Sequence, residues 1–266
     1  MNPIQYRYLP ISRRDWLMGA TLLWSVPLHA APDAQAILAA SDAIRNPSRP
    51  FSVTVTLTEF QGGSEVNAST LQSYSRVLAK GGQFASILRY VKPARDSGKL
   101  MLKVGSDLWF FDPATKASVR ISPQQRLAGQ ASNGDVVTVN FARDYTATIA
   151  GTEEITDGER RKRRSLKLGL TAASEEAVYA SAELWVDAES NQPLKARFYA
   201  DSGRALKTAY YRRYQSQLGA ERPTEMVIID GLDPQAVTVL RMSEYAAREI
   251  PVTWYSRDFL PRFQPE

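Results

Sequence analysis

The sequence predicts a mainly β protein, in which one antiparallel meander of about ten short strands follows a single helix. Apolar and polar residues alternate along many segments, as they do on half-buried strands. These segments recur roughly every 8–14 residues, with short turns containing Gly, Asn, Asp or Pro between them, which is the spacing of hairpins. A meander of this length is expected to curl into a barrel or a deeply bent sheet, because twisted open sheets rarely exceed about ten strands.

Residues 33–44 are expected to form the helix, because apolar residues recur at helical spacing and no breaker occurs before Pro47. Its apolar face includes Ile37, Leu38 and Ile44. A lone helix beside a large curved sheet must bury this face, and the concave side of the sheet is the available place. Two alternatives stay open, namely a mobile lid over the open end of the sheet and a permanently packed helix.

The first strand, residues 51–58, is the clearest, since Phe51, Val53, Val55 and Leu57 alternate with Ser and Thr. Further strands are expected at residues 71–78, 84–90, 99–104, 108–111, 165–170, 178–186, 194–200, 206–215, 224–229 and 236–246. Residues 136–145 fit either a strand or a short helix. Residues 259–263 are expected to be irregular.

The N-terminal segment has the pattern of a secretory signal peptide of the twin-arginine type. Arg13 and Arg14 precede an apolar run over residues 16–28, and Ala30 offers a small residue for cleavage. The run is too short and interrupted to span a bilayer, which requires roughly 20 apolar residues. An ordinary Sec signal with an accidental arginine pair is the alternative.

Cleavage after Ala30 would leave residues 31–266 as a single β domain. It would remove His29, the only histidine, and the chain has no cysteine. A mature protein without His or Cys cannot use a Ser-His-Asp triad, a Cys nucleophile, a Cys/His zinc site or a disulfide. The mature protein should therefore be soluble in an oxidising compartment, the periplasm, and carboxylates, Lys, Arg, Tyr and Ser/Thr remain for chemistry. We expect no enzymatic activity, cofactor or metal.

The charge of the mature chain is small and well mixed. Removal of residues 1–30 takes away Arg7, Arg13, Arg14 and Asp15, which lowers the formal net charge from +5 to +3. This balance does not indicate a nucleic-acid-binding surface.

One basic run could contact anionic lipid head groups. It consists of Arg160, Arg161, Lys162, Arg163 and Arg164. The alternative is a charged hairpin edge that blocks association between sheets, neutralised by the acidic residues just upstream.

The aromatic residues and the acidic residues can each be interpreted as part of a functional site. The aromatic residues could line a pocket for an apolar ligand or fill an ordinary core. Asp135, Asp144, Asp187 and Glu189 could form an acid/base pair for glycoside hydrolysis, but nothing in their spacing points to a shared site. Aspartates at strand ends more commonly serve turns.

A series of short motifs occurs in a fixed order through the chain. They are LRYVKP (88–93), GKLML (98–102), LWFFDP (108–113), VRIS (119–122), ELWVD (183–187), PLK (193–195) and GRALKT (203–208). In order and spacing the chain resembles the LolA-like family of outer-membrane lipoprotein-sorting proteins, from about residue 34 to the C-terminus. The resemblance implies an incomplete antiparallel β-barrel, shaped as a half-pipe, whose mouth is closed by helices over a hydrophobic cavity.

The resemblance also implies a monomeric protein that carries or senses lipid or acylated lipoproteins in the periplasm. Its partners would be an inner-membrane exporter or an outer-membrane acceptor. The alternative is a lipid-sensing or accessory module that does not transport. From the alternation, the residues expected to line the cavity are Val53, Val55, Leu57, Leu100, Leu102, Trp109, Leu184, Val186 and Phe198. A one-residue error in register would invert the face of any strand.

Overall fold

The computed structural model describes residues 33–78, 82–174 and 176–265. The predicted signal peptide lies outside the described residues. Helix α1 (Ala34–Arg45) begins at Asp33, whose side chain accepts a hydrogen bond from the backbone N of Gln35 at 2.9 Å. It ends at Asn46, where the backbone becomes extended before Pro47. The helix therefore forms where the apolar spacing predicts it.

Thirteen strands of the described chain form one antiparallel sheet, in the order β6-β5-β4-β3-β2-β1-β15-β14-β13-β12-β11-β10-β9. Their bounds are β1 (Phe51–Gln61), β2 (Ser64–Val77), β3 (Phe84–Lys92), β4 (Leu100–Val104), β5 (Asp107–Asp112), β6 (Ala117–Arg120), β9 (Tyr145–Thr156), β10 (Lys162–Ala172), β11 (Ser181–Asp187), β12 (Pro193–Tyr199), β13 (Ala205–Gln217), β14 (Ala220–Asp230) and β15 (Ala236–Ala247). Pairing of β1 with β15 joins the two halves of the chain.

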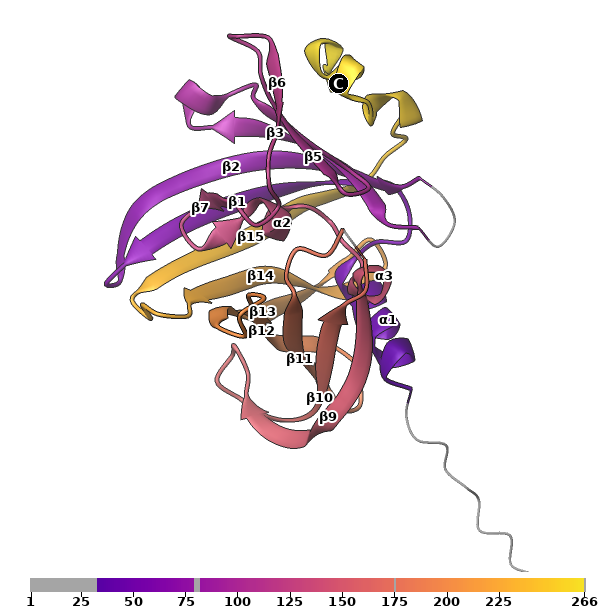
Figure 1. Ribbon diagram of the computed structural model, residues 1–266, viewed down its shortest axis with the longest axis vertical. Coiled ribbons are helices and arrows are strands. Elements are labelled where there is room, and N and C mark those ends of the chain that lie inside the picture. The colour runs from indigo at the N-terminus through magenta and orange to yellow at the C-terminus, as the bar shows by residue number, and fades with distance from the viewer. Residues whose placement is uncertain (1–32, 79–81, 175, 266) are drawn as a thin grey trace, which may run out of the picture. The chain divides into compact units, whose positions relative to one another are not determined.

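The sheet is bent but not closed, because its outermost strands β6 and β9 do not pair with each other (Figure 1). The predicted incomplete barrel is thus confirmed, with more strands than the expected ten or so. Both edge strands lay outside the predicted set. Most residues of β6 and β9 are exposed or half-buried, so these strands lack the strong apolar alternation that marked the others.

The chain between the two edge strands folds into the concave side of the sheet. We call residues 121–144 the plug. It contains β7 (Arg126–Ala128) paired with β8 (Ala131–Ser132), and the short helices α2 (Asn133–Val136) and α3 (Phe141–Asp144). In Figure 1, β7 and α2 lie in the space between the two halves of the sheet, and α3 lies against α1. The segment 136–145 therefore contains the last residue of α2, an irregular stretch over residues 137–140, the whole of α3 and the first residue of β9.

The C-terminal tail covers the opposite, convex face of β2 to β5. It contains the 3-10 turns η2 (Val252–Trp254) and η3 (Arg257–Arg262), drawn in yellow in Figure 1. The Trp254 ring lies 5.5 Å from that of Tyr74 and 4.8 Å from that of Phe263, centroid to centroid. This aromatic contact gives the tail its own apolar core, separate from the main one.

Three residues predicted to line the cavity lie in this second core. Leu100, Leu102 and Trp109 pack under the C-terminal tail and do not face the plug. The reason is that both faces of β4 are buried, so apolar residues do not alternate with polar ones and the parity of the strand cannot be read from sequence.

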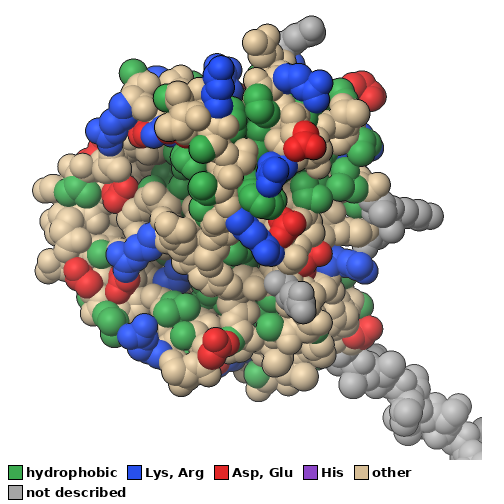
Figure 2. All heavy atoms as spheres, turned by 45° about the horizontal axis from the view of Figure 1, so that its top comes forward, with side chains coloured by type: hydrophobic (Ala, Val, Ile, Leu, Met, Phe, Trp, Pro, Cys, Tyr) green, Lys and Arg blue, Asp and Glu red, His purple; other side chains and the backbone are tan. Residues whose placement is uncertain are grey.

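None of the helices in the described ranges is long and apolar enough to cross a membrane. Basic and acidic side chains are interspersed over the face shown in Figure 2, as the mixed composition predicts.

Candidate functional site

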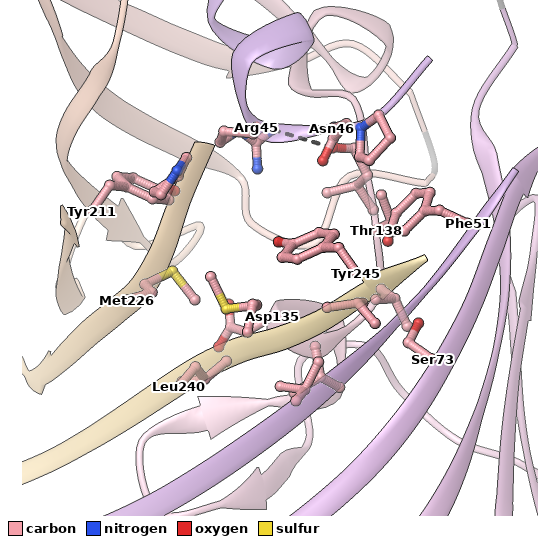
Figure 3. Close-up of a pocket in the computed structure, with 18 residues that line it drawn as sticks. Arg45, Asn46, Phe51, Ser73, Asp135, Thr138, Tyr211, Met226, Leu240 and Tyr245 are labelled. Carbon is pink, nitrogen blue, oxygen red and sulfur yellow. Dashed lines mark hydrogen bonds between the residues drawn. The ribbon is translucent and has the colours of Figure 1, made fainter. Parts of the chain in front are cut away.

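A cavity of about 110 Å³ lies between the concave face of the sheet and the plug (Figure 3). The sheet contributes residues from β1, β2, β13, β14 and β15, and the plug contributes Asp135 to Val139. Most of the wall from the sheet is apolar. The apolar and aromatic side chains of this wall are Phe51, Val53, Val55, Tyr211, Pro223, Met226, Leu240, Met242 and Tyr245.

The cavity is small compared with a lipid. An apolar cavity of about 150 Å³ holds one benzene molecule, and pockets for small ligands usually exceed about 300 Å³. The conformation seen here is therefore closed. A hydrocarbon chain would enter only if the plug moved away from the sheet.

A groove of about 440 Å³ lies next to the cavity, beside the C-terminal half of α1. Asn46 and Pro47 line both spaces, so the groove and the cavity adjoin each other. The groove is walled by apolar side chains such as Val77 and Phe84 and by the polar side chains of Asp42 and Arg143, among others.

The end of α1 holds the plug closed through side-chain hydrogen bonds to its backbone. The Arg45 guanidinium donates to the carbonyl of Val139 at 3.1 Å, and Asn46 Nδ2 donates to the same carbonyl at 2.8 Å. Arg45 also forms an ion pair with Asp42 and lies 4.0 Å above the Phe141 ring. In Figure 3, Arg45 and Asn46 lie at the top of the cavity.

Asp42 completes this latch, which we define as Asp42, Arg45 and Asn46. Its carboxylate is 5% exposed and accepts a hydrogen bond from the backbone N of Ala142 at 2.7 Å, near the start of α3. Burial alone would lower the pKa of Arg45, but the Asp42 carboxylate and the nearby Tyr211 raise it above its ordinary value. The latch guanidinium is therefore charged at every physiological pH.

A second set of contacts joins the plug to the first half of the sheet. The Thr138 hydroxyl lies 2.9 Å from that of Ser75, which in turn lies 2.9 Å from that of Ser86. The side-chain amide of Gln83 exchanges two hydrogen bonds with the backbone of Asn140, at 2.7 and 3.1 Å. These are side-chain contacts, which can be broken without disrupting the sheet ladder.

A buried ion pair anchors the plug to the second half of the sheet. Asp135 of α2 pairs with Lys207 of β13, and both side chains are less than a tenth exposed. Tyr179 Oη donates to Asp135 Oδ1 at 2.9 Å, and Ser132 contacts Tyr179 Oη at 2.8 Å. Burial, together with the neighbouring Asp135 carboxylate, holds the pKa of Tyr179 well above its usual value, so the phenol keeps its proton. Asp135, Lys207, Tyr179 and Ser132 thus each have a hydrogen-bond or ion-pair partner within this set.

The sequence-predicted residues fall into three groups in the structure. Val53 and Val55 line the cavity. Leu57, Leu184, Val186 and Phe198 belong to the same buried core but do not line the cavity. The lid residues lie on α1, where Leu38 is fully buried in that core and Ile37 and Ile44 are half-buried.

The residues of the latch were not found from sequence. Arg45 and Asn46 touch a carbonyl more than ninety positions away, and no local motif marks such a contact. A basic residue and an amide residue at the end of an amphipathic helix are typical of an ordinary helix C-terminus, so they did not indicate a latch.

Much of the basic run is neutralised by nearby carboxylates. Arg163 pairs with Asp187 at 2.7 Å, Arg161 lies 3.5 Å from Asp157, and Lys162 lies 3.5 Å from Glu154. These pairs support the interpretation of the run as a charged hairpin. Asp187 also caps the turn after β11 by accepting hydrogen bonds from Ser190 at 2.9 and 2.8 Å, so it serves a turn.

Comparisons with known proteins identify relatives in sequence and in fold. A family model with the description "Uncharacterized protein" matches residues 82–262. A LolA superfamily protein from Nitrosomonas europaea is 33% identical over 86% of this chain and 100% of its own, with a TM-score of 0.76. No curated protein matches the chain.

Two more distant solved structures share the fold. A DUF1329 family protein from Desulfovibrio piger is 19% identical, with 86% of this chain and 100% of its own covered and a TM-score of 0.72. A putative outer membrane lipoprotein-sorting protein domain from Vibrio parahaemolyticus is 18% identical, with 86% and 98% covered and a TM-score of 0.68.

Proposed function

Since the chain belongs to the LolA superfamily, we propose that it is a periplasmic carrier that holds lipid, or the acyl chains of lipoproteins, between its sheet and its plug. In this proposal it delivers that cargo toward the outer membrane. The observation that carries the proposal is a cavity with a mostly apolar wall on the sheet side, closed by a segment that side chains hold in place. The void departs from the close packing usual in protein interiors, where cavities larger than a water molecule are few.

The energy of transfer explains why such a chamber is useful. A buried methylene group is worth about 0.8 kcal/mol, so a sixteen-carbon chain exposed to water costs on the order of 12 kcal/mol. Opening the plug breaks a few hydrogen bonds of roughly 0.5–1.5 kcal/mol each. Opening also uncovers the apolar side chains of Val136, Val137, Val139 and Phe141 of the plug. In this proposal a bound hydrocarbon chain covers the exposed wall and offsets these losses, so cargo itself holds the plug open.

No catalytic group is required for this function. Carriage needs a hollow and a movable wall, and both are supplied here by apolar and hydrogen-bonding side chains. This fits a chain whose only histidine is His29, within the predicted signal, and which has no cysteine.

The direct test is to ask whether the protein carries lipid. The purified protein is extracted with organic solvent, the extract is analysed by mass spectrometry, and uptake of a fluorescent fatty acid is measured. We expect about one bound chain per protein. Absence of both extracted lipid and uptake would reject the proposal.

Two variants of one strand sharpen this test. Val55 lines the cavity, whereas Leu57 is fully buried on the same face without lining it. Val55→Phe should fill the void, preserve folding and weaken fatty-acid uptake. Leu57→Phe should instead lower the free energy of unfolding by about 1–3 kcal/mol through overpacking. Equal uptake by Val55→Phe and the unmodified protein would argue against this cavity as the binding site.

Transfer between membranes separates a carrier from a sensing or accessory module. A carrier moves labelled lipid from donor to acceptor vesicles in proportion to its concentration. Stoichiometric recovery of a membrane protein partner, together with binding but no transfer, would favour the sensing module.

A further inference from the structure

Arg222 of β14 is a buried arginine in the groove that adjoins the cavity. Only 4% of the residue is exposed. Its Nη1 donates to the carbonyls of Ala43 and Ile44 at 2.9 and 2.8 Å, and its Nε donates to the carbonyl of Gln217 at 3.1 Å. Across residues 33–78, 82–174 and 176–265, no carboxylate pairs with Arg222 and no hydrogen bond uses its Nη2.

The contrast with Arg45 shows what Arg222 lacks. Arg45 has the Asp42 carboxylate as a counter-ion, which raises the pKa of the guanidinium above its ordinary value. Burial lowers the pKa of Arg222, and only Tyr245 acts against that effect. The C-terminus of α1 supplies a partial negative charge of roughly half a unit, which is less than a guanidinium requires. A buried charge without a full counter-charge is costly in a protein.

Arg222 lines the 440 Å³ groove that adjoins the inner cavity. Arg143 of α3 lines the same groove, is exposed, and forms no ion pair within the described part of the chain. The acid in the groove wall, Asp42, is already engaged by Arg45 and by the backbone N of Ala142. The groove therefore offers two positive charges without acidic partners beside an apolar wall that includes Val77 and Phe84.

We propose that this groove binds the anionic head group, a phosphate or a carboxylate, of an amphiphile whose hydrocarbon chain enters the chamber. The inference rests on the proposed function and adds the charge of the cargo to it. Guanidinium groups suit such a ligand because they donate several hydrogen bonds in one plane to phosphate or carboxylate oxygens. Because the groove and the cavity share Asn46 and Pro47, a head group in the groove would lie next to the start of its own chain.

The test uses three ligands that separate head group from chain. Binding to the delipidated protein is measured by titration calorimetry for monopalmitoyl phosphatidic acid, for monopalmitoylglycerol, and for inorganic phosphate alone, each amphiphile below its critical micelle concentration. We expect the phosphate-bearing amphiphile to bind at least about tenfold more tightly than the neutral one, since hydrogen bonds to charged groups are the stronger kind.

Arginine variants locate the effect. Arg222→Gln and Arg143→Gln should each reduce the preference for the anionic amphiphile about fivefold or more, and leave binding of the neutral one unchanged. Arg143 is exposed, so its variant keeps the test valid if loss of the Arg222 contacts to α1 impairs folding. The matched control is Arg204→Gln, an exposed arginine of the β12–β13 turn without an ion pair among the described residues, which should not alter the preference.

The outcomes distinguish this inference from the proposed function. Equal affinity for both amphiphiles would overturn the head-group site while leaving lipid carriage intact. Inorganic phosphate binding as tightly as the anionic amphiphile would overturn it in favour of a site for a free anion. Failure of both amphiphiles to bind would reject the proposed function, and this inference with it.

Discussion

At the scale of single residues, the Asp42 carboxylate balances the buried charge of Arg45, and the same guanidinium contacts the plug, although Arg45 Nε has no hydrogen-bond partner among the described residues. Its guanidinium is 13% exposed and is shared between the Asp42 carboxylate, the Val139 carbonyl and the Phe141 ring. Loss of Arg45 would therefore leave Asp42 buried with a single backbone donor, Ala142.

We expect Arg45→Met to loosen the plug. The variant should lower the free energy of unfolding by about 1–3 kcal/mol, the cost of leaving a buried polar group short of partners. It should also speed amide hydrogen exchange over residues 139–145 more than elsewhere. Arg49→Met, an exposed position four residues along, is the control and should change neither quantity. Unchanged exchange in Arg45→Met would contradict the role of the latch.

The contribution of Glu225 to the free energy of unfolding should depend on pH. Its side chain is fully buried on β14 among Arg212, Arg213 and Arg241. Burial alone would raise the pKa of Glu225, but hydrogen bonds from Arg241 and Arg212 and the charges of Arg212 and Arg213 lower it below its usual value. The stability contributed by Glu225 is therefore present above about pH 4.3, the unfolded value, and is lost as the pH falls through the native pKa.

Glu225→Gln should lower the free energy of unfolding at pH 7 by about 1–3 kcal/mol, and this difference should shrink toward pH 3. Urea unfolding at several pH values measures it. Glu221→Gln, an exposed change on the same strand, should cost less than about 0.5 kcal/mol. A difference that stayed constant from pH 7 to pH 3 would show that charge is not the cause.

At the scale of elements, the plug and the sheet are held together by one buried ion pair and by short polar contacts. Asp135 and Lys207 join α2 to β13 with both side chains less than a tenth exposed. Breaking a buried pair from one side leaves an uncompensated charge, whereas replacing both partners with apolar groups can be nearly neutral.

Lys207→Met alone should therefore cost about 3–5 kcal/mol of unfolding free energy, and Asp135→Leu combined with Lys207→Met should cost clearly less. Denaturant unfolding of the single and double variants forms a double-mutant cycle. If the double variant were as unstable as the sum of the single ones, the two side chains would not be coupled.

A strand can be predicted from sequence, with the correct face toward the core, only when its two faces differ clearly in polarity. In β1 one face is apolar and the other carries Ser and Thr, so the sequence placed Val53 and Val55 on the cavity side, where they lie. In β4 both faces are buried, so Leu100 and Leu102 were assigned to the wrong side. The plug was undetermined because its short elements are fixed by contacts with distant residues, and tertiary contacts leave no local period.

At the scale of the whole described domain, the open half-pipe and the inserted plug together form the walls of the cavity. The sheet cannot close because β6 and β9 do not pair, and the chain between them supplies the wall that fills the gap. The plug strands β7 and β8 pair only with each other and not with the large sheet, which the pairing of β1 with β15 keeps continuous. Movement of the plug can therefore change the volume of the chamber while the ladder stays intact.

In the proposed function, the plug must leave the sheet for a hydrocarbon chain to enter. The hydroxyls of Ser75 on β2 and Thr138 in the plug are 2.9 Å apart, so cysteines at both positions lie within reach of a disulfide. The natural chain has no cysteine to compete with them.

The decisive measurement is fatty-acid uptake by the Ser75→Cys/Thr138→Cys variant in its oxidised and reduced forms. We predict that the oxidised form, with its plug fastened, takes up no fatty acid, and that reduction restores uptake to the level of the unmodified protein. Equal uptake by the oxidised and reduced forms would contradict the account.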